Sequence, residues 1–169
     1  KHIIKIVKMK FTTKIQLATL FIFMFSFSAM AQNAKYKCML QMTNYKGLEA
    51  YVVVSLIDAK GKYEKTLYVM GTDKKWYNGF KDWFKNMSKK NEKLSAVTGA
   101  SVAAGDRSIT TFTIDESKMN KGYKLRFETS VEDQKYYTTD VEIPLTTDAV
   151  TKKTDGTGYI RYVKLNKAQ

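Results

Sequence analysis

The chain has almost no histidine or cysteine, and this scarcity excludes several classes of active site. Its only histidine is His2, and its only cysteine is Cys38. His2 precedes a segment that we interpret as a secretory signal, so we expect the mature protein to contain no histidine. A Ser-His-Asp triad, a Cys-His pair, a His-ligated zinc and a His-ligated haem are thereby excluded. A single cysteine also excludes an intramolecular disulfide and a CxxC redox pair.

The N-terminal residues 1–31 have the pattern of upstream sequence followed by a secretory signal peptide. Lys10 and Lys14 follow Met9, an apolar run continues to Phe27, and Ala29-Met30-Ala31 supplies a small-x-small cleavage site. The apolar run is shorter than the roughly 20 residues of a membrane span. We therefore expect export to the periplasm, cleavage before Gln32, and no integral membrane segment in the mature protein.

The charge is strongly positive. Lys and Arg number 29 against 16 Asp and Glu, which gives +13, and because five of the lysines precede residue 32 the mature part carries +8. A basic exported protein can meet an anionic membrane surface, an acidic glycan or an acidic partner protein. We expect no nucleic acid partner in that compartment. The lysines are spread along the chain, so solvated faces are the simplest interpretation.

Alternation of apolar and polar residues predicts β-strands through most of residues 32–169. The longest such run extends from Tyr123 to Glu132, and Cys38 falls on the inward side of another, where a buried, inert thiol is expected. Residues 51–57 are nearly all apolar, as in a strand covered on both faces. The other strands are predicted near 36–42, 63–70, 109–114, 141–145 and 159–165. This pattern predicts a single, mainly β domain, an antiparallel β-sandwich of immunoglobulin-like shape.

One segment has helical rather than strand periodicity. At 100° per residue, six apolar residues of 74–89 fall within about 120° of arc: Trp76, Tyr77, Phe80, Trp83, Phe84 and Met87. We expect one inserted amphipathic helix with Asp73 as its N-cap and both tryptophans turned toward the sheet. The alternative is that this aromatic surface flanks a planar ligand or a partner protein.

The segment Thr98-Gly99-Ala100-Ser101 is the strongest candidate for a chemical site. Its small residues permit close approach to the backbone, and Ser101 offers a hydroxyl in an expected exposed connection. It resembles the acceptor motif of exported flavoproteins, in which Asp, two variable residues, Ser or Thr, Gly, Ala and a final Thr or Ser receive FMN through a phosphoester. Ser95 stands where that motif has Asp. The resemblance implies a cofactor-binding segment, Thr98 to Ser101, with covalent FMN on Ser101 and Trp76 or Trp83 beside the flavin ring.

A wider resemblance covers roughly residues 36–145. The run Tyr51-Val52-Val53-Val54, the turn Asp58-Ala59-Lys60-Gly61, the Trp-rich segment and the run Gly122-Tyr123-Lys124-Leu125-Arg126 occur in the order seen in a family of predicted periplasmic proteins, domain of unknown function 2271. The resemblance implies exported electron transfer. The implied partners are a membrane-bound reductase or PepSY-type protein and a flavin transferase.

The acidic residues suggest neither a metal site nor catalysis. Asp106, Asp115-Glu116 and Glu132-Asp133 lack the spacing of a calcium loop. Asp140 and Glu142 are expected on the polar face of a strand, where alternation alone places charges. The sequence leaves enzyme activity open; the electron carrier that the resemblance implies, or a binding protein, is favoured over a turnover enzyme. The two hypotheses are a flavinylated carrier and a cofactor-free sandwich that binds a partner protein or a glycan through its helix face and basic rim.

Overall fold

The computed structural model describes residues 33–94 and 97–168. The expected signal peptide, its cleavage site before Gln32, and Ser95 lie outside these described residues. Among the helices within those ranges, none combines the length and the apolar character needed to cross a membrane.

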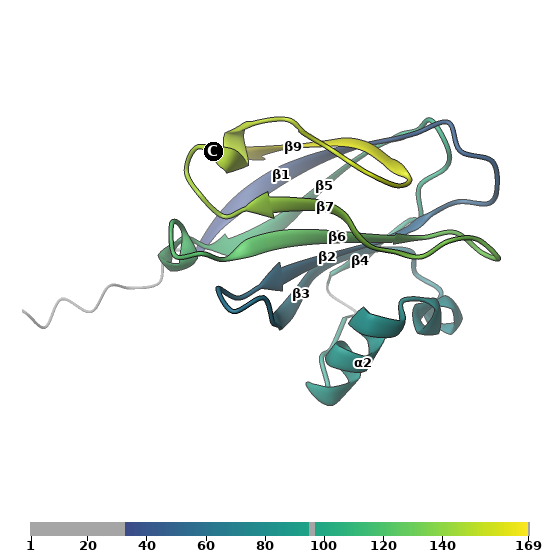
Figure 1. Cartoon of the computed structure of the whole chain (residues 1–169), viewed down its shortest axis with the longest axis horizontal. Coiled ribbons are helices and arrows are strands. Elements are labelled where there is room, and N and C mark those ends of the chain that lie inside the picture. The colour runs from purple at the N-terminus through teal and green to yellow at the C-terminus, as the bar shows by residue number, and fades with distance from the viewer. Residues whose placement is uncertain (1–32, 95–96, 169) are drawn as a thin grey trace, which may run out of the picture. The chain divides into compact units, whose positions relative to one another are not determined.

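The described residues form two packed β-sheets (Figure 1). The four-stranded sheet has the order β5-β1-β9-β8 and the five-stranded sheet the order β4-β3-β2-β6-β7. The strands are β1 (Asn33–Met42), β2 (Tyr51–Ile57), β3 (Tyr63–Met70), β4 (Thr98–Gly99), β5 (Arg107–Asp115), β6 (Lys124–Ser130), β7 (Tyr137–Pro144), β8 (Thr154–Asp155) and β9 (Ile160–Lys167). The helical elements are η1 (Lys74–Gly79), α2 (Lys81–Lys89), η2 (Glu116–Lys118) and η3 (Ala149–Thr151).

The predicted β-sandwich is confirmed. Neighbouring strands pair antiparallel except β3 and β4, which run parallel. The immunoglobulin-like strand arrangement stays a prediction. Each predicted strand is present, and the hairpin between β2 and β3 turns where Asp58 accepts hydrogen bonds from the backbone N–H groups of Lys60 and Lys62, both at 2.8 Å.

The main core lies between the two sheets. Alternate side chains of β1 point into it, with Cys38 and Leu40 fully buried. Burial in this apolar setting raises the pKa of the Cys38 thiol to about 12, which keeps it protonated and unreactive. β2 is buried on both faces, as its apolar run predicted.

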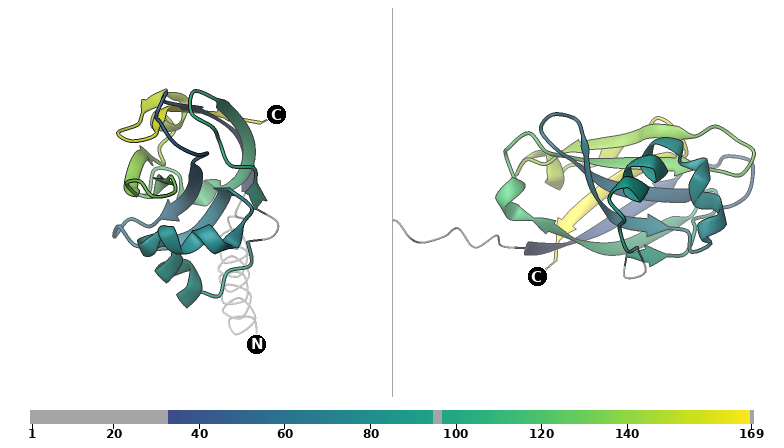
Figure 2. Two further views of the ribbon diagram at one scale, coloured as in Figure 1. Left: turned by 90° about the vertical axis from the view of Figure 1, so that its right-hand side faces the viewer. Right: turned by 90° about the horizontal axis from the view of Figure 1, so that it is seen from below.

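A second core lies between the outer face of the five-stranded sheet and the helical segment (Figure 2). Val53 and Val69 supply the sheet side, and Tyr77, Phe80 and Trp83 supply the helical side. This apolar contact explains why β2, whose other face packs in the main core, is nearly all apolar on both sides, with the buried Ser55 as its exception.

The helical segment differs from the single helix that its sequence predicted. It consists of η1 and α2, separated at Phe80, whose backbone (φ −89°, ψ 66°) leaves the helical region. Asp73 caps η1 as expected, accepting a hydrogen bond from the N–H of Lys75. The break lets Phe80 turn fully inward, and it rotates Trp76 out of the apolar stripe. Trp83 is buried, but the prediction that Trp76 faces the sheet is wrong: 38% of its surface is exposed.

Two carboxylates expected on polar strand faces are buried instead. Glu128 of β6 is 3% exposed because the helical segment covers that end of the sheet. Asp140 of β7 is 1% exposed because the connection between β8 and β9 closes over it. In both cases another segment of the chain covers the polar face of the strand. The alternation of residues along a strand does not indicate whether such a segment covers it.

Candidate functional site

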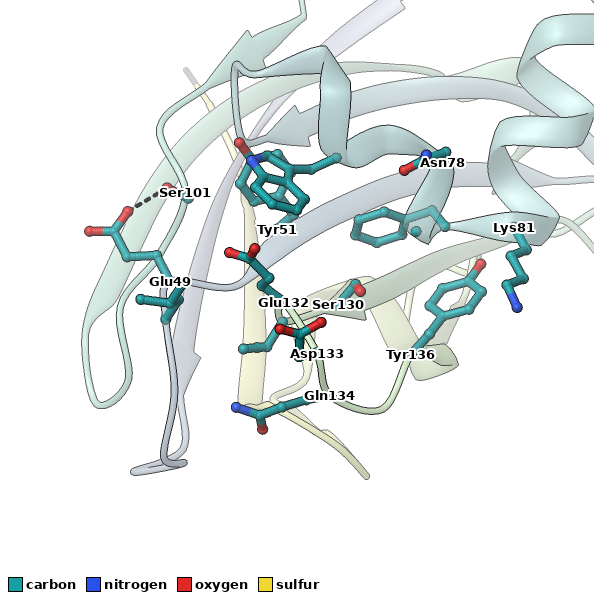
Figure 3. Close-up of a pocket in the computed structure, with 15 residues that line it drawn as sticks. Glu49, Tyr51, Asn78, Lys81, Ser101, Ser130, Glu132, Asp133, Gln134 and Tyr136 are labelled. Carbon is teal, nitrogen blue, oxygen red and sulfur yellow. Dashed lines mark hydrogen bonds between the residues drawn. The ribbon is translucent and has the colours of Figure 1, made fainter.

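An open cleft of about 780 Å³ lies beside η1 on the helix side of the five-stranded sheet. Four stretches of chain that are distant in sequence form its walls (Figure 3). The lining residues are Leu48, Glu49, Tyr51, Trp76, Asn78, Gly79, Phe80, Lys81, Ser101, Ser130, Val131, Glu132, Asp133, Gln134 and Tyr136. The volume falls within the range of small-molecule and cofactor sites.

Two loops meet at one end of the cleft because a glycine allows it. The side-chain amide of Gln134, in the connection between β6 and β7, donates a 2.6 Å hydrogen bond to the carbonyl of Lys46 in the connection between β1 and β2. Gly47 has φ +136°, and a Cβ there would lie 2.0 Å from the Gln134 amide nitrogen. A side chain at position 47 would strain the backbone and displace the Gln134 amide from the Lys46 carbonyl.

Aromatic rings form the inner wall. Trp76 is exposed, and the Lys75 ammonium lies 5.0 Å from the centre of its ring. Tyr51 contacts the buried Tyr77 edge to face, with ring centres 6.4 Å apart, and so is held in place from behind. An exposed indole beside a supported phenol ring offers a planar ligand a stacking surface.

Ser101 lies on the cleft wall with a hydroxyl that is partly exposed. Its Oγ donates a short hydrogen bond to the carboxylate of Glu49 (Figure 3). Two backbone hydrogen bonds join Ala50 and Val102, with N–O distances of 2.8 and 3.0 Å. They hold the adjacent residues Glu49 and Ser101 side by side. Ser101 also borders a smaller cavity of about 290 Å³ that includes Arg107 and Ser108. The Ser101 hydroxyl thus lies at the cleft wall, hydrogen-bonded to a carboxylate.

The rest of the predicted cofactor segment has different surroundings. Thr98 and Gly99 form β4 at the edge of the five-stranded sheet, paired with Val69 and Met70. A Cβ at position 99 would lie 2.3 Å from the hydroxyl of Tyr68, so the molecule's own side chain accounts for this glycine. Ala100 is exposed and Ser101 lies beyond the paired region. Of the four residues, only Ser101 lines the cleft.

Trp83 does not reach the cleft. Its indole Nε1 donates a 2.9 Å hydrogen bond to Thr66 Oγ1, and Tyr63 and Glu92 complete the same buried network through bonds of 2.6 and 2.7 Å. This network fastens α2 and the residues after it to β3. Of the two tryptophans expected beside a ligand, only Trp76 lines the cleft.

The cleft is rich in carboxylates, since Glu49, Glu132 and Asp133 line it and Lys81 is the one cation among the lining residues. At the far wall the hydroxyl of Tyr136 donates a short hydrogen bond to the buried Glu128. Desolvation by burial raises the pKa of Glu128 to about 7, an effect that the Tyr136 bond and Arg126 reduce. The pKa of Tyr136 is raised as well, first by burial and then by the neighbouring carboxylate.

Metal ligands do not gather at this cleft. Across residues 33–94 and 97–168, no three His, Cys, Asp or Glu side chains lie close enough together to hold a metal ion. Asp106, Asp115 and Glu132, the acidic residues considered from sequence, lie in separate parts of the fold.

Several cleft residues carried no signal that sequence reasoning could detect. Glu49, Tyr51 and Tyr136 belong to a loop, a strand and a second loop, and only the sheet pairing brings them together. The exposure of Leu48, 63%, which marks the rim of the cleft beside Glu49, is likewise visible only in the structure.

Comparison with known proteins gives one match. The model of a family described as predicted periplasmic protein, domain of unknown function 2271, matches residues 33–162, most of both sheets and the whole cleft. No curated protein and no solved structure matches.

Proposed function

The chain belongs to the domain of unknown function 2271 family of predicted periplasmic proteins, and on that basis we propose that it carries a flavin, FMN, covalently attached to Ser101. One observation carries the proposal. The Ser101 hydroxyl is accessible on the wall of a cleft of cofactor size, in a segment with the last four residues of a flavin acceptor motif. The protein would then act as an electron carrier for a membrane-bound reductase.

The attachment chemistry needs a hydroxyl oxygen that can attack phosphorus. In the proposed step, Ser101 Oγ forms a bond to the FMN phosphorus of FAD, the bond between the two phosphates breaks, and AMP leaves. The Ser101 proton passes to the Glu49 carboxylate, to which it is already hydrogen-bonded. A flavin transferase supplies the FAD and binds the leaving group.

The cleft suits the flavin ring better than it suits the phosphate. Trp76 and Tyr51 provide aromatic surface for the neutral ring system. The phosphodiester would carry a negative charge beside Ser101, close to the Glu49 carboxylate that takes up the serine proton. Arg107 lines the smaller cavity that Ser101 also borders, and its positive charge would offset that of the phosphodiester.

Co-expression with a flavin transferase tests the proposal. The exported protein should gain the mass of one FMN phosphoryl unit and flavin absorbance, and Ser101→Ala should lose both. Ser130→Ala removes another hydroxyl from the same cleft and serves as the matched control, which should remain fully modified. Ser95→Asp, which completes the usual motif, should raise the yield. Protein that stays colourless both as wild type and as Ser95→Asp would refute the proposal.

A glycan-binding module is the second candidate, and the acidic groups of the cleft favour it. Exposed Trp76 offers a flat surface for a sugar ring, while Asn78, Glu132 and Gln134 offer hydrogen-bonding groups around it. Titration of unmodified protein with neutral oligosaccharides should then change tryptophan fluorescence, and Trp76→Ala should abolish the change. The buried Trp83 provides the internal reference, since its signal should not respond.

A further inference from the structure

The outer face of the four-stranded sheet carries exposed cations that form no ion pair within residues 33–94 and 97–168. Four exposed cations form what we call the basic sheet face: Lys35 and Lys37 on β1, Arg107 on β5 and Lys164 on β9. They share a face because their inward neighbours, such as Tyr36 and Leu165, are buried. The sequence alone had indicated only cations spread along the chain.

The cations of this face differ from those of the five-stranded sheet in their ion pairing. On the five-stranded sheet Glu142 pairs with Lys124 at 3.1 Å and with Arg126 at 2.8 Å. Within residues 33–94 and 97–168, no cation of the basic sheet face has a carboxylate within 4.0 Å. Arg107 instead donates a 3.1 Å hydrogen bond to the neutral side chain of Gln41, which holds its guanidinium on the sheet without cancelling its charge.

Apolar surface lies among these cations. Ile109 of β5 is 56% exposed and lies opposite the partly buried Met39 in the β1–β5 register. Met39 in turn pairs with Lys164 of β9. The helical segment η1–α2 packs on the other sheet, so it does not cover this face (Figure 1). A flat surface with apolar side chains inside a set of free cations combines the two features that attract proteins to anionic lipid.

We propose that the basic sheet face docks the protein on an anionic phospholipid surface. Lysine and arginine would contact headgroup phosphates, and Ile109 and Met39 would lie at the level of the acyl boundary. The negative charges of an anionic lipid surface are distributed over a wide area. The cations of this face are likewise distributed over three strands and do not converge on a single pocket. Arg107 and Ile109 of this face also line the smaller cavity beside Ser101, so the docked surface adjoins that cavity, whereas Trp76 and Lys81 of the cleft belong to the helical segment on the other sheet. The inference does not depend on the flavin.

Vesicle sedimentation tests the proposal with protein purified from the periplasm of an expression host. Wild type should bind vesicles of equimolar phosphatidylglycerol and phosphatidylcholine, should not bind phosphatidylcholine alone, and should dissociate as salt is added. Each cation near an anionic surface contributes about a fivefold factor, so Lys35→Glu with Lys37→Glu should weaken binding by about 25-fold or more.

The matched control changes the same net charge on another face. Lys85→Glu with Lys89→Glu alters two exposed lysines of α2 and should reduce binding by much less than the β1 pair. Equal losses from the two double variants would overturn the proposal, because net charge rather than this face would then be responsible. Binding to phosphatidylcholine alone would also overturn it. Wild type that ignores vesicles but binds polyglutamate would assign the face to an acidic protein partner instead. Circular dichroism checks that both variants keep the fold.

Discussion

Two buried carboxylates on adjacent strands of the five-stranded sheet have opposite surroundings. Asp140 accepts four hydrogen bonds: from Thr129 Oγ1 at 2.6 Å and from the backbone N–H groups of Thr157, Gly158 and Ile160 at 2.7 to 3.0 Å. Glu128 is similarly buried, but within the described residues its side chain accepts a hydrogen bond only from the hydroxyl of Tyr136. The number of donors decides what burial does to a carboxylate.

The two carboxylates therefore have different roles. Asp140 joins β7 of one sheet to the start of β9 in the other, and its acceptors satisfy backbone groups that would otherwise be buried without partners. Glu128 has little to offset its desolvation, so burial raises its pKa toward neutrality. Three substitutions test this distinction, from the largest expected effect to the smallest.

Asp140→Ala should have the largest effect. It would leave three backbone N–H groups and the Thr129 hydroxyl without their acceptor, and each unsatisfied buried group costs about 1 to 3 kcal/mol. We expect the free energy of unfolding in urea to fall by about 4 kcal/mol. Asp140→Asn retains one acceptor oxygen, so its free energy of unfolding should fall by less. Equal, small losses in both variants would show that the four bonds contribute little.

Glu128→Gln should change the pH dependence of stability. The folded-state pKa of Glu128, about 7, lies above its ordinary value of 4.5, so the folded protein binds more protons between these values. Wild-type stability from this group is therefore full below about pH 4.5 and is lost as the pH rises through about 7. As the pH rises between these two values, the free energy of unfolding of the neutral variant should increase by about 3 kcal/mol relative to that of wild type. Urea unfolding of both proteins at each pH measures this change. A difference in free energy of unfolding that is the same at both pH values would contradict the prediction.

Tyr136→Phe should have the smallest effect and tests the single donor itself. Without its hydroxyl the ionised Glu128 loses a hydrogen bond, so its pKa should rise further and stability above pH 7 should fall by about 1 to 2 kcal/mol. The loss should be smaller in the Glu128→Gln background. Carboxyl titration by NMR measures the pKa directly. A pKa that falls in Tyr136→Phe would reverse the assignment of the donor.

Strand periodicity was sufficient to predict the seven longer strands but not the layers that cover them. β4 and β8 have two residues each, too few for a period to be visible. The break at Phe80 could not be predicted, since the six apolar residues of the segment fit one continuous helix. Tertiary contact with Tyr136, at a ring distance of 5.4 Å, favours the bent form. Local periodicity contains no information about such distant contacts.

The candidate site was predicted only in part. The composition of residues 98–101 singled out Ser101, but its partner Glu49 is 52 positions away and is brought to it by the Ala50–Val102 bridge. Trp76 was identified as an aromatic candidate from the helical stripe, yet it reaches the cleft because it leaves that stripe. Chemistry visible in short segments was therefore found, whereas a cleft made from four distant segments required the fold.

The position of β1 has a consequence for how the chain folds. β1 is an interior strand of its sheet, and its two neighbours, β5 and β9, come from the middle and the end of the chain. Pairing residues 36–42 with 160–167 closes a long loop, which slows folding. Until the last strand is available, β1 has an open edge that can pair with another molecule. A chain delivered N-terminus first therefore cannot complete this sheet before residues 160–167 arrive, and in the interval the open edge of β1 is exposed to pairing with other chains.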